Sequence, residues 1–189
     1  MPFTSTEHPH LTTPAALRAL GHPTRLKILG RLQLEGDATA TECAEDVGES
    51  PSSCSYHLRT LAKHGFVERV PSDDGRERRW RARIVGFEFT AGTEGSEELQ
   101  AAAQLARAAL LELDDDAVRD YFAHERSFSV AWREAALFST STIVVTPKEL
   151  DELGRRIQEL LGPLYATARE RTPRGARVVR IGVRAVPTP

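Results

Sequence analysis

Cysteine and long apolar runs are scarce in this chain of 189 residues. Its two cysteines, Cys43 and Cys54, cannot form the disulfide framework that staples small secreted domains, which favours a reducing compartment. No apolar run approaches the roughly 20 residues of a membrane span. The first ten residues lack the basic and apolar regions of a secretory signal. We therefore expect a cytoplasmic protein that makes no membrane contact.

The motifs of catalysis are missing as well. The sequence contains no glycine-rich phosphate loop, no nucleophile motif and no zinc-protease spacing. An acidic run at 114–116 lies near His124 and Glu125, but aspartates at a helix start are better explained by capping and by the helix dipole. We expect no enzymatic activity and no cofactor.

Positive charge is concentrated in one part of the chain. The net charge is −2, which argues against a general polyanion-binding protein. Between Ser50 and Arg83, however, eight lysine and arginine residues stand against four acidic ones. A local basic region on a near-neutral protein suits one defined stretch of DNA, because each phosphate that a cation neutralises releases counterions.

Caps, prolines and glycines predict four short helices in the first third of the chain. Threonine or serine precedes three of them, proline occupies the first helical position in three, and glycine follows each end. Their expected ranges are 14–20, 23–35, 40–47 and 51–64. Short helices joined by short loops, with a glycine in the turn before the last one, are typical of a helix-turn-helix.

The fourth helix has two contrasting faces. At helical spacing, Cys54, Leu58 and Leu61 share one side with Ala62, and this stripe is expected to join the core. Hydroxyl, aromatic and cationic residues lie on the opposite side or its shoulders, where they suit the base edges and phosphates of a major groove. The DNA contacts predicted from this helix are Ser52, Ser53, Ser55, Tyr56, His57, Arg59, Thr60 and Lys63.

A basic β-hairpin follows the fourth helix. Residues 66–70 alternate in polarity, Asp74 and Gly75 supply turn chemistry, and residues 79–83 form the return strand. Such a hairpin is a wing. Its arginines are predicted to contact phosphates or the minor groove, and we assign Arg76, Arg78 and Arg79 to this role.

Residues 14–83 resemble the winged helix-turn-helix of the arsenic-repressor (ArsR) type of bacterial transcription regulator. The resemblance is carried by ALRALGHPTRLKILGRL, by SPSSCSYHLRTLAKHGFVE and by GRERRWRAR. It implies a homodimer that reads a pseudo-palindrome in double-stranded DNA and represses until an effector binds. Metal-sensing members of that family carry two cysteines one residue apart on the third helix. This chain has Cys43 alone there, so we expect no metal site.

The second half of the chain reads as a separate segment. A small, polar stretch at 91–96 is a plausible linker, and a helix begins at Glu97. Heptad-like spacing in that helix predicts a dimer interface or a core face, and we favour the interface. Its residues are Leu99, Ala103, Ala106, Leu110 and Leu113. The expected divisions are a tail at 1–12, a winged domain at 13–92 and a dimerisation or effector domain at 97–189.

Helices and strands are expected to alternate to the end of the chain. The acidic run interrupts the helix that begins at Glu97, residues 136–145 form a strand, a capping box at Thr146 begins another helix, and residues 177–186 form a last strand. The fold class is therefore α+β, a winged helix-turn-helix followed by an α/β segment. A pocket for a small apolar or aromatic effector is predicted to be lined by Trp132, Phe138 and Tyr165.

The sequence as a whole predicts a cytoplasmic, homodimeric repressor controlled by a small molecule. Three alternatives stay open. In the first, the C-terminal domain docks a protein partner. In the second, that domain is an enzyme tethered to DNA. In the third, Cys43 and Cys54, with His57 three residues beyond the latter, form a metal or thiol sensor, although a metal site needs about four convergent ligands.

Overall fold

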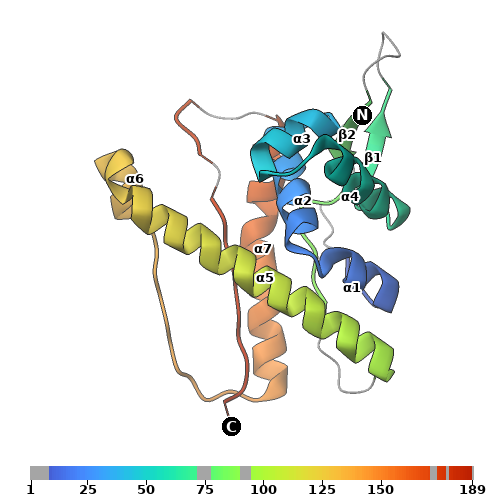
Figure 1. Cartoon of the computed structure of the whole chain (residues 1–189). Helices are drawn as coiled ribbons and strands as arrows, with labels where there is room; N and C mark the ends of the chain where they lie inside the picture. Colours follow the sequence, from blue (N-terminus) through green and yellow to red (C-terminus); the bar gives the residue numbers. More distant parts are fainter. Residues whose placement is uncertain (1–8, 72–77, 90–94, 171–173, 178, 189) are drawn as a thin grey trace. The chain divides into compact units, whose positions relative to one another are not determined.

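The computed structural model describes most of the chain (Figure 1). The described residues are 9–71, 78–89, 95–170, 174–177 and 179–188, without the side chains of 165–170. The chain divides into two compact units, Met1–Leu113 and Asp114–Pro189. The expected linker at 91–96 is not the point of division, because the first half of the long helix belongs to the first unit. The functional boundaries at 13–92 and 97–189 stay predictions.

The first unit holds the predicted helices and the wing. Its elements are α1 (Pro14–Leu20), α2 (Pro23–Glu35), α3 (Ala40–Val47), α4 (Pro51–Lys63), β1 (Val67–Val70) and β2 (Arg79–Ala82). The expected caps are present. The hydroxyl oxygen of Thr39 accepts from the Glu42 amide while the Glu42 carboxylate accepts from the Thr39 amide, and the Ser50 hydroxyl accepts from the Ser53 amide. Local chemistry therefore sets these helix starts.

The wing is a two-stranded antiparallel sheet that is joined to the loop before α3. Val67 pairs with Ala82 and Arg69 with Trp80. Trp80 also exchanges both backbone hydrogen bonds with Ala38, at 2.7 and 3.0 Å. These bonds fix the wing beside the N-terminal end of α3. The predicted turn at 72–75 lies outside the described residues.

A single apolar cluster holds the first unit together. Its fully buried large side chains come from α1, α2, α4 and β1 and include Leu20, Ile28, Leu58, Leu61 and Val67. Burying an aliphatic side chain of this size is worth about 1.5–3 kcal/mol. The apolar stripe predicted for α4 is thereby confirmed as the side that anchors this helix.

The long helix α5 (Glu97–His124) is continuous over 28 residues, so the interruption predicted at 114–116 is wrong. The carboxylates there form ion pairs along the helix, from Asp115 and Asp116 to Arg119. An aspartate inside a helix costs less than about 0.7 kcal/mol relative to alanine. This penalty is too small to break a helix whose first half is packed in a core.

The heptad-like face of α5 lies in the core of the first unit. Ala103, Ala106 and Leu113 are buried in its apolar cluster, and Leu99 and Leu110 pack against that cluster half-buried. The structure thus uses these positions as a core face. A dimer interface made by the same residues stays a prediction that would require them to leave this core.

Gly21, at the end of α1, allows α5 to approach closely. A Cβ atom at this position would lie 2.9 Å from the Cβ of Leu105. We expect Gly21→Ala to lower the free energy of unfolding by about 1–3 kcal/mol, since the crowded atoms belong to a packed helix. Chemical denaturation measures this. Gly154→Ala is the control, because nothing lies within 4 Å of its added methyl group. It should raise stability by about 0.5–1 kcal/mol, and equal effects of the two changes would contradict the assignment.

The second unit is helical with extended connections. After the end of α5 come η1 (Glu125–Ser127), α6 (Val130–Ala135) and α7 (Pro147–Glu170). The capping box at Thr146 is confirmed. The strands expected at 136–145 and 177–186 are wrong for the described residues, which are extended but pair with no other segment. Strand propensity depends on cross-strand partners, and these segments have none here.

The two units together give an α+β fold dominated by helices, as expected, although its only described sheet is the wing. None of the described helices combines the length and the apolar character that crossing a membrane would require.

Candidate nucleic-acid interface

Helix α4 presents a hydroxyl and cationic face away from the core. Ser52, Tyr56, Arg59 and Lys63 are exposed, Tyr56 to 62 %. Three further predicted contacts are half-buried: Ser53, Ser55 and Thr60. The helix is short because Pro51 begins it and Gly65, with φ of 75°, follows its end.

Two of these side chains also bond to their own helix. The Nε atom of Arg59 donates to the Ser55 carbonyl at 3.0 Å, and the Thr60 hydroxyl donates to the Tyr56 carbonyl at 3.1 Å. The bond from Arg59 engages its Nε atom and leaves the two terminal nitrogens for other contacts. This is the geometry that a bidentate contact to guanine requires.

His57 is not part of this face, and its prediction as a DNA contact is wrong. It is only 7 % exposed. Its ring lies 4.7 Å from the ring of His22, and its Nδ1 atom has no hydrogen-bond partner within the described structure. Burial, and then the neighbouring His22 and Arg25, hold the pKa of His57 below its usual value. His57 is therefore a neutral core residue beneath α4.

Buried histidines make stability depend on pH. Burial also lowers the pKa of His64, with help from Lys63 and Arg25. The unfolded chain binds these protons at about pH 6.5, but the folded chain binds them only at lower pH. The stabilisation is therefore complete above pH 6.5 and is lost as pH falls through the lowered pKa values.

We expect the free energy of unfolding to fall between about pH 7 and pH 5. The slope should be smaller in His57→Leu, because the variant no longer has this titrating group. Urea unfolding at a series of pH values measures both slopes. Identical slopes in the two proteins would show that His57 does not contribute.

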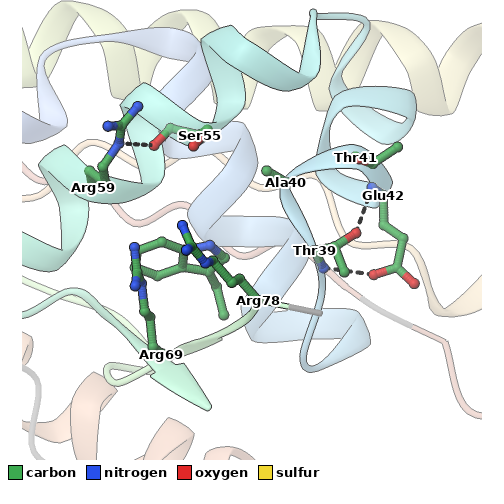
Figure 2. A pocket seen from close by; sticks show the side chains of 9 residues that line it. Thr39, Ala40, Thr41, Glu42, Ser55, Arg59, Arg69 and Arg78 are labelled. Atoms are coloured by element: carbon green, nitrogen blue, oxygen red, sulfur yellow. Dashed lines mark hydrogen bonds between the residues drawn. The ribbon is translucent and has the colours of Figure 1, made fainter. Parts of the chain in front are cut away.

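A basic hollow lies between α3, α4 and the wing, with a volume of about 630 Å³. Arg59 comes from α4, Arg69 from β1, and Arg78 directly precedes β2. In Figure 2 these three arginines lie on one side of the hollow and the first turn of α3, with Thr39 and Thr41, on the other. Glu42 also lines the hollow, but its carboxylate is engaged in capping α3, and the three arginines are the groups that suit an anionic phosphate.

Arg69 and Thr41 were not predicted as site residues. Arg69 was counted among the cations, but its place depends on the register of the wing. It stands opposite Trp80, and its guanidinium carbon lies 5.1 Å from the centre of that ring. The alternation of strand residues does not give the register, so only the charge of Arg69 was a usable signal.

The remaining predicted wing arginines differ in what their side chains contact. Arg79 donates to the Asp37 carbonyl at 2.9 Å and pairs with Glu42 at 3.2 Å, and Arg81 makes two hydrogen bonds to the Asp37 carboxylate, at 2.8 and 2.6 Å. These bonds hold the wing against α3. Arg79 therefore supports the wing, and its assignment as a DNA contact stays a prediction. Arg78 lines the hollow, and its contact with DNA stays a prediction, whereas Arg76 lies outside the described residues.

The two cysteines are buried among apolar side chains. Burial raises the pKa of Cys43 to about 11 and also raises the pKa of Cys54. The reactive thiolate form is therefore disfavoured at both positions. No group of three or more histidine, cysteine, aspartate or glutamate side chains in the described part of the chain is placed to hold a metal.

The residues predicted to line an effector pocket are placed as follows. Phe138 packs on Phe122, with 5.0 Å between ring centres, and stays 57 % exposed. Trp132 is half-buried on α6, and the side chain of Tyr165 lies outside the described part. A hollow in this unit is lined by other residues, among them Ile143 and Leu153. The effector pocket stays a prediction.

Comparison with known proteins supports the domain at this site. A family model described as a helix-turn-helix domain matches residues 20–70, from the end of α1 to the end of β1. No curated protein matches the chain. The chain therefore contains a helix-turn-helix domain, which is typical of DNA-binding transcription regulators, and the exposed face of α4 belongs to it, as does the part of the basic hollow that Arg59 and Arg69 line.

Proposed function

We propose that this protein is a dimeric transcriptional repressor of the ArsR type. It acts in the cytoplasm by binding an operator, without catalysis. The observation that carries the proposal is the exposed face of α4, within a helix-turn-helix domain, next to the arginine-lined hollow. The resemblance of residues 14–83 to ArsR-type regulators supports the repressor role.

In this proposal α4 enters the major groove. Ser52, Tyr56 and Arg59 contact base edges there. Arg69 and Arg78 bind the phosphates beside the groove. Two protomers place two such helices on half-sites about 10 bp apart or a multiple of that spacing.

The second unit controls release in this proposal. A small apolar or aromatic effector binds it and favours a spacing of the two α4 helices that no longer fits the operator. Only a difference in affinity for the two spacings has this effect. A thermal-shift screen followed by a gel shift with each hit tests this part of the proposal.

Selection from a random duplex library tests the function itself. The full-length protein should enrich an inverted repeat whose half-sites have the expected spacing. Enrichment of a single, unrepeated half-site would contradict binding by a dimer. Failure to enrich any sequence would contradict operator binding.

A further inference from the structure

We infer that the second unit carries the dimer surface, with its apolar side covered by the same side of a second copy of this chain. This inference rests on the proposed function in one respect, since reading an inverted repeat needs two copies. It places the interface on the second unit, away from the heptad-like face of α5.

The segment 179–186 is the first observation. Positions 180, 182 and 184 face Asp114, which pairs with Arg180 at 3.2 Å and also with Arg184. A Cβ atom at Gly182 would lie 2.7 Å from the same carboxylate. The odd-numbered side carries Val179, Ile181 and Val183, which are 60 %, 55 % and 55 % exposed. The polar side of this segment is thus held against its own unit, and the apolar side faces outward.

Further apolar side chains of the second unit are exposed. Fifteen large ones in its described part are each more than a third exposed. They come from α5, α6, α7 and the two extended segments, with Leu160 at 74 % and Val144 at 102 %. Summed over the unit they leave on the order of 1,000 Å² of apolar surface open, and one side of a standard interface buries about 800 Å².

The unpaired backbone of the extended segments also supports a second copy as the partner. Residues 136–145 and 179–186 are rich in β-branched side chains, and their described residues make no backbone hydrogen bond to another segment. Unpaired extended chain of this kind is a template for pairing with another chain. A second copy would supply both the apolar contact and these hydrogen bonds.

A second copy fits this surface better than a membrane or a highly charged partner. The area matches one side of a stable interface, about 800 Å² per partner, and homodimer interfaces are the most apolar class. Helices that lie on membranes carry a polar face rich in lysine and arginine. The polar face of α7 has mixed charge, with Arg155 paired to Glu152 and Glu159, and Arg156 paired to Glu152.

Sedimentation velocity of the full-length protein without DNA tests the inference. We expect a dimer, and we expect Ile181→Glu with Val183→Glu to be a monomer with an unchanged circular dichroism spectrum. Leu34→Glu, which changes a 52 % exposed leucine of the first unit, should stay dimeric. If the double variant does not fold, Leu160→Glu on α7 provides the same test.

A wild-type monomer at all concentrations, or a folded variant that stays dimeric, would overturn the inference. Binding of the wild-type protein to vesicles containing anionic lipid would overturn it in favour of a membrane. The outcome is separate from that of the proposed function. A folded double variant that stays dimeric while the wild type selects an inverted repeat contradicts only the inference, and a dimer that binds no duplex contradicts only the function.

Discussion

Arg59→Ala should weaken binding to the selected operator by about 1–3 kcal/mol and leave the fold intact. Arg59 is exposed, and its only described bond, from Nε to Ser55, stays within α4. Its loss therefore removes a base contact without opening the core. Fluorescence anisotropy at fixed salt measures the affinity, and thermal unfolding checks the fold.

Two further variants make the test of Arg59 specific. Arg59→Lys should recover little of the loss, because lysine keeps the charge but lacks the planar fork that binds guanine through two bonds. Arg119→Ala removes an exposed arginine of α5 and should leave the affinity unchanged. If Arg59→Ala binds as the wild type does, Arg59 does not read the operator.

Changing Arg69 and Arg78 together to alanine should weaken binding to every duplex alike. Both line the basic hollow, where the expected ligand is phosphate, and phosphate contacts carry no sequence information. The slope of log K against log salt should fall by about 4 in magnitude, because two phosphate contacts are lost in each of the two protomers. Titrations at several salt concentrations, with specific and unrelated duplexes, measure this slope.

Arg81→Ala is the matched control for the wing. Its guanidinium group is engaged by Asp37, so the variant should lose stability and keep the salt slope of the wild type. A double variant of Arg69 and Arg78 that lost affinity for one operator only would show that the hollow reads sequence and does not bind phosphate in general.

The sequence predicted the first unit well because its helix limits depend on neighbouring residues. A threonine cap, its glutamate three positions later and a following glycine are enough to place α3. Burial within α4 was harder to predict. His57 lies at the boundary of the apolar stripe, and only the packing of α4 against His22 decides that it points inward.

Contacts between distant segments account for the remaining differences. In the sequence, Arg79 cannot be distinguished from its neighbour Arg78, because both are arginines of the basic hairpin. The pairing of the wing with the loop before α3 brings Arg79 to Asp37 and Glu42. In the second unit, residues 136–145 have the composition of a strand. Composition cannot supply the partner that a strand needs, and within the described residues that partner is missing.

Hydroxyl-radical footprinting of the protein with and without its selected operator tests most directly whether α4 faces DNA. Tyr56, 62 % exposed on α4, should become protected when DNA binds. Phe122, 56 % exposed on α5 in the second unit, should react equally in both samples at a concentration where the protein is dimeric. Full binding of DNA with an unchanged rate of oxidation at Tyr56 would contradict the account.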